Sequence, residues 1–272
     1  MHNYKSLLIA IVCGILSGIP FLYTGEVTSL LDVINKLSFS EFYIDATYIA
    51  KFFVWYFPLM IFQIVWGTYI YRHFCTASVY YFSRLKNRIT WFAGEIPKLY
   101  LYILLYLTVL LVSCMLPMLL FRGIVVDSNS IIILIYYYVI QSLWLYITTM
   151  LINILSIKWG SSIGFVLVSG VQIFFIGMFA PLQSILNFDV PENLEFKSRI
   201  LKLNPISHLV LNWHSSSVSE LNGEINKFDI LFDLNESVVL FLFLSVIVSI
   251  IGCFVVKRQE FITINRETGG TV

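Results

Sequence analysis

Residues 99–121 read LYLYILLYLTVLLVSCMLPMLLF, an apolar run without a single charged side chain. A helix of ~20 such residues crosses the ~30 Å hydrocarbon core of a bilayer. The chain has five further runs that also lack Asp, Glu, Lys, Arg and His, at 7–23, 52–71, 131–155, 163–180 and 238–256. The sequence therefore predicts an all-α polytopic membrane protein, with residues 1–272 forming a single domain of six transmembrane helices.

The composition of the whole chain agrees with this prediction. Hydrophobic residues make up 58% of the 272 residues, charged residues make up 12%, and the mean hydropathy is +0.85. A water-soluble domain of this size does not cover its surface with so few charges, so soluble enzymes and nucleic-acid-binding proteins are excluded. A β-barrel is excluded because the runs do not alternate and are about twice as long as a barrel strand.

The connections between the runs carry different charges on the two predicted sides of the membrane. If the N-terminus is cytoplasmic, the inside set holds three acidic residues, namely Glu95, Glu260 and Glu267. The same set holds ten basic residues: Lys5, Arg72, Arg84, Lys86, Arg88, Lys98, Lys158, Lys257, Arg258 and Arg266. The other side holds the remaining seven basic and thirteen acidic residues. The positive-inside rule therefore predicts that both termini are cytoplasmic.

The first run resembles a signal peptide because Lys5 precedes an apolar segment. No small-x-small cleavage pattern ahead of a soluble domain follows it, so we expect residues 7–23 to remain as a membrane anchor. The cysteines fall in the runs or on the predicted cytoplasmic side, and they are Cys13, Cys75, Cys114 and Cys253. This placement predicts neither a disulfide nor a metal cluster.

Ionisable groups are absent from every predicted span, and this absence reduces the number of functions that the chain could have. Ion-coupled carriers place such groups near the bilayer midplane, and intramembrane metalloenzymes need His or acidic ligands on their helices. The histidines lie outside the runs, at His2, His73, His208 and His214. The Gly-x-x-x-x-Gly-Lys-Ser/Thr loop that binds nucleotide phosphates is also missing. We therefore expect no catalytic residue, no bound metal and no enzymatic activity in this chain, so a separate subunit would supply energy for any active transport.

Uncharged polar residues do occur within the predicted spans. Two interpretations stay open for them. They line a pathway for an amphipathic substrate, or they form hydrogen bonds between helices or subunits. The candidate pathway residues are Gln63, Gln141, Thr148, Asn153 and Gln172.

Residues 72–98 form a predicted cytoplasmic segment far longer than a turn requires. Apolar residues recur in it at helical spacing, at Val79, Phe82, Leu85, Ile89 and Phe92, and the opposite face is basic. The pattern predicts a basic amphipathic helix, which either lies on anionic lipid headgroups or acts as a lever in a groove of a cytoplasmic ATPase. The residues predicted to couple the chain to an ATPase are Tyr80, Tyr81, Phe82, Arg84, Lys86, Arg88 and Trp91.

Short motifs in this segment carry a family resemblance. Cys75-Thr76 is followed by Val79-Tyr80-Tyr81-Phe82, then by Ser83-Arg84, and Lys98 directly precedes the third span. With the six spans, the cytoplasmic ends and the missing nucleotide-binding domain, this pattern resembles the permease subunit of a type-2 ABC exporter. Cys75 stands where that family usually has Gly. The resemblance implies that a partner ATPase binds ATP and Mg²⁺, and that this chain binds no cofactor.

Residues 181–237 form a predicted extracytoplasmic segment between the last two spans. Asn204-Pro205 is typical of a helix start, with Asn as the N-cap and Pro at the first helical position. The helix would have one apolar face, made by Ile206, Leu209, Val210 and Trp213. We expect this short helix to rest in the outer leaflet or to dip into it.

The same helix contains two histidines. His208 and His214 are six residues apart and would lie on different faces, so we expect ordinary polar helix residues and no metal pair. In the resembling family the region before the last span forms an external gate. This implies the candidate gate residues Asn204, Pro205, His208 and Trp213.

The resemblance implies a permease in a bacterial plasma membrane. Its partners would be cytoplasmic ABC ATPase subunits, a second permease copy or paralogue, and the lipid bilayer, with no nucleic acid. The implied activity is export of an amphipathic antimicrobial peptide, lipid or drug, and hence antimicrobial peptide resistance. The alternative is a non-transporting membrane sensor or immunity protein that acts through residues 181–237.

Overall fold

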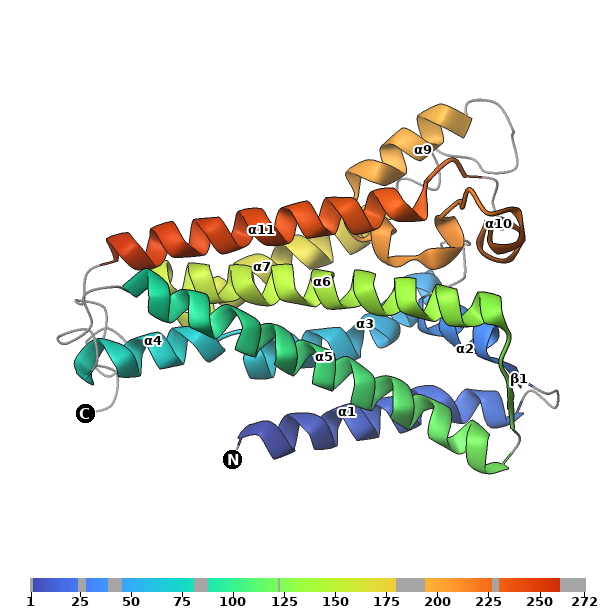
Figure 1. Cartoon of the computed structure of the whole chain (residues 1–272), viewed down its shortest axis with the longest axis horizontal. Coiled ribbons are helices and arrows are strands. Elements are labelled where there is room, and N and C mark those ends of the chain that lie inside the picture. Colours follow the sequence, from blue (N-terminus) through green and yellow to red (C-terminus); the bar gives the residue numbers. More distant parts are fainter. Residues whose placement is uncertain are drawn as a thin grey trace.

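Long helices lie side by side along the long axis of the molecule in the computed structural model (Figure 1). The structure describes residues 2–23, 28–38, 46–80, 88–121, 123–179, 194–226 and 230–259. The long helices are α1 (His2–Gly18), α3 (Ala46–Trp66), α5 (Arg88–Phe121), α6 (Ser128–Trp159), α7 (Ser161–Gly177) and α11 (Leu234–Arg258). The prediction of an all-α fold is confirmed.

Shorter elements lie at the ends of the long helices. They are η1 (Ile19–Tyr23), α2 (Leu30–Leu37), α4 (Tyr69–Tyr80), α9 (Leu194–Leu203), η2 (Ser207–Leu209), η3 (Leu211–Trp213) and α10 (Ser219–Ile225). Two-residue strands, β1 (Thr28–Ser29) and β2 (Ile124–Val125), pair in parallel. This pairing joins the segment after α1 to the segment after α5 (Figure 1).

Three of the long helices, α5, α6 and α11, are long and apolar enough to cross a membrane. Apolar helical segments of shorter length occupy Leu7–Leu22 and Ser161–Gly177. Helix α11 shows this most directly, because it exposes many large apolar side chains, such as Val239, Leu242 and Phe243. Such a surface is stable in lipid and not in water, so the chain is a membrane protein.

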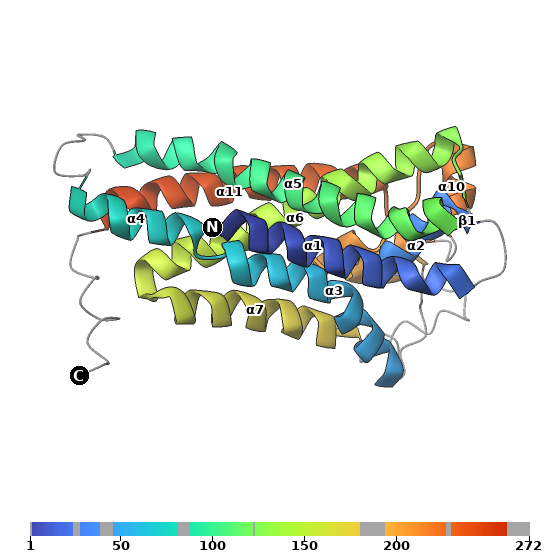
Figure 2. The same cartoon turned by 90° about the horizontal axis from the view of Figure 1, so that it is seen from below.

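The two ends of the bundle differ in charge. At one end α4 leads toward α5, α6 turns into α7, and α11 terminates, whereas α9, α10 and the β1–β2 pair lie at the other end (Figures 1 and 2). The first end is here called the basic end because its helices carry Arg72, Arg88, Lys98, Lys158, Lys257 and Arg258. The second is called the cap end, after residues 194–226. Six of the ten basic residues that the sequence sorts to one side therefore lie at one end of the molecule.

Two glycines allow α1 to pack closely on α5. A Cβ atom on Gly14 would lie 2.5 Å from the backbone oxygen of Leu110, and a Cβ atom on Gly18 would collide with the backbone oxygen of Cys114. The four-residue spacing places both glycines on one face of α1. Small residues at this spacing let two membrane helices approach until their backbones touch.

Helix α6 is the centre of the bundle. It contacts α2, α3, α4, α7 and α11, and its residues 140–150 are all buried or nearly so. Asp127 caps its N-terminus through the backbone N–H of Ser130 at 3.1 Å. Gly160 has a φ of +96°, a backbone conformation that favours glycine, and this residue lets the chain reverse from α6 into α7.

Two predicted spans have different boundaries in the structure. The span expected at 52–71 is divided, because α3 ends at Trp66 and α4 begins at Tyr69. The break brings Gly67 close to α6, where an added Cβ atom would lie 3.0 Å from the Ile152 side chain. Helix α5 begins at Arg88, well before the predicted start at residue 99, because the polar segment 88–98 continues the same helix.

Candidate functional site

A network of uncharged polar side chains joins α3, α6 and α7 inside the bundle. Gln63 on α3 and Gln172 on α7 exchange two hydrogen bonds, since each amide Nε2 donates to the other's Oε1 at 3.0 Å. Gln63 Nε2 also donates to Thr148 Oγ1 on α6 at 3.1 Å. Three of the five candidate pathway residues therefore meet in one place.

Two aromatic side chains extend this network. Trp144 Nε1 donates to the hydroxyl of Tyr56 at 2.6 Å, and that hydroxyl donates to Gln172 Oε1. Gln172 Nε2 and Thr148 Oγ1 direct their remaining hydrogens to backbone oxygens of their own helices. Every polar hydrogen of these five side chains thus has an acceptor, and all five residues are buried. Of the two interpretations that the sequence leaves open, this closed geometry favours contacts between helices.

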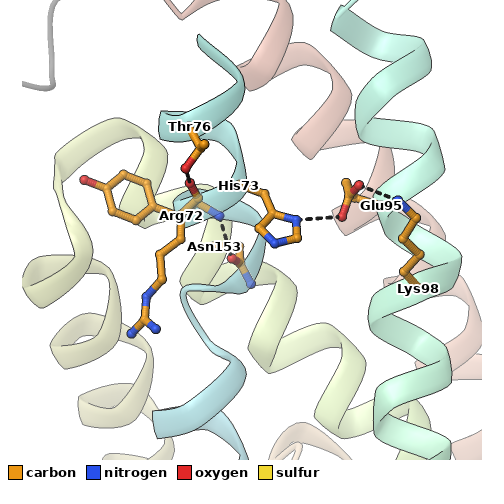
Figure 3. A network of polar contacts seen from close by, with 7 residues as sticks. Arg72, His73, Thr76, Glu95, Lys98 and Asn153 are labelled. Carbon is orange, nitrogen blue, oxygen red and sulfur yellow. Dashed lines mark hydrogen bonds and ion pairs between the residues drawn. The ribbon is translucent and has the colours of Figure 1, made fainter. Parts of the chain in front are cut away.

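The two other candidate pathway residues lie elsewhere. Asn153 Oδ1 accepts the backbone N–H of Tyr71 at 3.0 Å (Figure 3). Asn153 Nδ2 donates to the backbone oxygen of Thr149. Asn153 thereby caps the first turn of α4, where backbone N–H groups have no partner within the helix. Gln141 on α6 is 1% exposed, and within the described part of the chain neither polar atom of its amide has a hydrogen-bond partner.

A buried carboxylate connects α4 with α5 at the basic end. Glu95 Oε1 lies 2.8 Å from Lys98 Nζ, and Glu95 Oε2 lies 3.3 Å from His73 Nδ1 on α4 (Figure 3). The side chain of Glu95 is 5% exposed, whereas those of His73 and Lys98 are 50% and 59% exposed. Burial alone would raise the pKa of the Glu95 carboxyl, but the hydrogen bonds and the charge of Lys98, with the hydrogen bond of His73, lower that pKa. Glu95 is therefore ionised and holds α4 against α5.

The beginning of α5 also contacts the end of α11. Arg88 Nη1 donates to the backbone oxygen of Gln259 at 2.7 Å. One turn further along α5, Phe92 fills the space beside Gly252, where an added Cβ atom would collide with its ring. These contacts connect the predicted coupling segment directly with the last helix.

The predicted coupling helix is only partly described. Tyr81, Phe82, Arg84 and Lys86 lie outside the described residues. The ends of the predicted helix belong to two other helices, since Tyr80 ends α4 and Arg88 begins α5. Because α4 runs toward the basic end and α5 runs away from it, the prediction of one helix through Val79, Ile89 and Phe92 is wrong at both ends (Figures 1 and 2). Arg88 and Trp91 instead lie in the first turn of α5, beside α11 and beside Phe74 of α4.

The predicted gate helix is replaced by two 3₁₀ turns. Asn204 Oδ1 accepts the backbone N–H of Ile206 at 2.9 Å, as expected of a cap, but η2 and η3 follow in place of an α-helix. The expected apolar face is entirely inside the protein, because Ile206, Leu209, Val210 and Trp213 are each at most 1% exposed. The apolar side chains of this segment therefore contact protein, whereas its position relative to the outer leaflet stays a prediction.

The candidate gate residues pack against the cap end of α7. Asn204 Nδ2 donates to the backbone oxygen of Phe175 on α7 at 2.8 Å. The ring of Trp213 packs edge-on against Phe179, with a centroid distance of 5.2 Å. Pro205 is partly buried in the turn between α9 and η2. The segment is thus attached to the cap end of the bundle.

The two cap-end histidines meet, contrary to the sequence prediction. His208 Nδ1 lies 2.9 Å and His214 Nε2 lies 2.7 Å from Ser237 Oγ, in the first turn of α11. Extended backbone at Val210, between the two 3₁₀ turns, breaks the helical periodicity that would have separated the rings. No signal in the sequence indicates this, because Ser237 lies far along the chain and has no recognisable spacing to either histidine.

Within the described residues, no three His, Cys, Asp or Glu side chains are grouped as metal ligands. Searches among known protein families, characterised proteins and solved structures find no match to this chain. The geometry of its own residues is therefore the basis for a functional assignment.

Proposed function

We propose that this chain is the permease subunit of a bacterial ABC exporter, with six spans, both termini in the cytoplasm and the basic end facing the cytoplasm. The charge difference between the two ends supports this orientation, because basic residues flanking spans are retained on the cytoplasmic side. The cap end, which holds most of the described acidic residues, then faces outward.

The observation that carries the proposal is the bracing of α5 at the basic end. His73 and Lys98 hold Glu95, and Arg88 holds the end of α11, so both flanks of the segment between α4 and α5 are fixed to long helices. A displacement of this segment would pass directly into α5, and from α5 into α1 and α11, which pack along it. In a permease driven by a separate ATPase, the cytoplasmic face must transmit the movement of the ATPase to the transmembrane helices.

The substrate pathway belongs between two permease subunits in this proposal. Every polar hydrogen of the Gln63–Gln172 network has an acceptor within the chain, so this network offers no free donor to a substrate. The partners are a second permease copy or paralogue and two ABC ATPase subunits that bind ATP and Mg²⁺. The substrate class is an amphipathic peptide, lipid or drug, which reaches the pathway from the membrane.

The test is reconstitution of the complex. The chain is co-expressed with candidate ABC ATPase subunits from the same organism, purified by a tag on the permease, and assayed for ATP hydrolysis in nanodiscs. We expect a stable complex whose ATPase activity and transport are lost in Phe82→Ala and Arg84→Lys, which alter the predicted contact with the ATPase. If no ATPase binds and the chain alone confers resistance, the sensor or immunity function holds and the exporter proposal is abandoned.

A further inference from the structure

The contacts around Ser237 require more hydrogens than the neutral groups possess. Each imidazole touches a backbone oxygen as well as the serine hydroxyl. His208 Nε2 lies 3.1 Å from the oxygen of Lys202, and His214 Nδ1 lies 2.8 Å from the oxygen of Val210. With the two contacts to Ser237 Oγ, the cluster therefore contains four contacts of hydrogen-bond length.

Each of these contacts needs one polar hydrogen of its own. A neutral imidazole supplies one N–H and a serine supplies one O–H, so the three neutral side chains supply three hydrogens, whichever tautomers they adopt. One of the four contacts then joins two lone pairs. Because Ser237 and His214 are 0% exposed and His208 is 3% exposed, water does not reach the cluster freely to correct the deficit.

One additional proton completes the set. The protonated ring donates from both nitrogens, to a backbone oxygen and to Ser237 Oγ, and the serine O–H donates to the lone pair of the other ring. We propose that His208, Ser237 and His214 form a binding site for a single proton, which one imidazole holds while the serine hydroxyl connects it to the other, neutral ring by hydrogen bonds. The proton comes from water, and no electron transfer or other ligand is involved.

The surrounding charges favour His208 as the ring that binds the proton. From α11, Glu236 faces His208 and attracts a positive charge, while Lys202 of α9, ion-paired with Glu236 at 2.6 Å, opposes it. Helix α6 adds no charge there, because its one charged residue, Lys158, lies in its last turn at the basic end. Burial lowers the pKa of both rings, and that of His214, which also faces His208, falls to about 3. His208 therefore takes the proton and His214 stays neutral.

Because the two rings lie among apolar side chains, binding of the proton affects how residues 204–214 pack at the cap end. The ring of His208 packs against Phe232 and Phe241, with centroid distances of 4.7 and 5.5 Å, and the ring of His214 packs against Phe232 at 4.4 Å. A charge placed between these rings alters the contact between residues 204–214 and α11. The site does not depend on the transport proposal, since it is a property of one folded chain.

The test is nitrogen NMR of the full-length chain in lipid nanodiscs, with ¹⁵N-labelled histidine. The substitutions His2→Gln and His73→Gln leave only the two cap-end rings visible. Between pH 8 and pH 4 we expect one ring to gain a second N–H while the other remains neutral. Ser237→Ala should lower the proton affinity of the titrating ring by about tenfold, or one pH unit, whereas Ser237→Thr, which keeps the hydroxyl, should leave it unchanged.

Three results would overturn the proposal. These are titration of both rings with the same midpoint, the absence of any titration down to pH 4, and an identical titration in the Ser237→Ala variant. The first two are read from the chain with its native Ser237, so the proposal remains testable if Ser237→Ala fails to fold.

Discussion

Gln63 and Gln172 face each other across the contact between α3 and α7 and exchange two amide hydrogen bonds of 3.0 Å each. In lipid or in a buried interior an unpaired amide hydrogen is costly, and the loss of either glutamine leaves the other with one Nε2 hydrogen that has lost its acceptor. The pair fixes the register of α3 against α7 and, through Thr148, against α6.

Removing one member of this pair should destabilise the protein more than removing both. We expect Gln63→Leu to lower the stability by about 1–3 kcal/mol, because it removes the acceptor of one Gln172 Nε2 hydrogen, which then stays buried without a partner. The double variant Gln63→Leu/Gln172→Leu should recover part of this loss. Thermal unfolding in detergent measures each value.

Gln141 supplies the matched control. Its amide already lacks a hydrogen-bond partner among the described residues, so Gln141→Leu should leave the stability unchanged or raise it. If Gln141→Leu instead abolished transport at full stability, Gln141 would be a pathway residue.

The close contact of α1 with α5 should not tolerate a larger side chain. Gly14→Val places its Cβ atom against the backbone of Leu110, and overpacking of this kind costs about 1–3 kcal/mol. Gly170→Val on α7 is the control, because an added Cβ atom there meets nothing within 4 Å among the described residues. Expression level and melting temperature should fall for Gly14→Val alone, and equal losses in both variants would contradict the predicted contact.

The charge of Glu95 should matter more for coupling than for folding. Glu95→Gln keeps the shape of the side chain but weakens its contacts with Lys98 and His73. We expect a stability loss of only about 1 kcal/mol, because both partners are half exposed and solvent screens them. ATP-dependent transport by the reconstituted complex should fall well below that of Glu195→Gln, a control in which the lost partner is the exposed Arg199. Equal transport by both variants would mean that Glu95 has no part in coupling.

The orientation can be tested with single cysteines on a background without native cysteine. Ser217 at the cap end and Ser162 at the turn between α6 and α7 are both exposed. We expect Ser217→Cys to react with a membrane-impermeant maleimide in intact cells, and Ser162→Cys to react only after permeabilisation. The reverse labelling pattern would invert the proposed topology.

The stability of the protein should fall in mild acid. Burial lowers the pKa of His208 and His214 below the ordinary value of 6.5. The unfolded chain therefore binds more protons, so the contribution of these residues is complete above about pH 6.5 and declines as the pH falls. The melting temperature should decrease between pH 7 and pH 5, with a smaller slope in His208→Gln/His214→Gln. A slope in this double variant equal to that of the native chain would contradict the prediction.

The sequence by itself determined the helical class, because runs such as 99–121 are apolar on every face and long enough to cross a bilayer. It also determined the charge difference between the two ends, since Arg72, Lys158 and Lys257 follow directly from the order of runs and connections. Both properties are local, so composition and length along the chain are sufficient to predict them.

Only the tertiary structure decided which polar side chains meet. Gln63 and Gln172 are 109 positions apart, and nothing in their own surroundings indicates that they pair. His208 and His214 meet at Ser237 because backbone conformation between two 3₁₀ turns overrides the α-helical periodicity that Asn204-Pro205 predicts. Such contacts depend on how helices pack in three dimensions, and a periodicity along one helix does not contain that information.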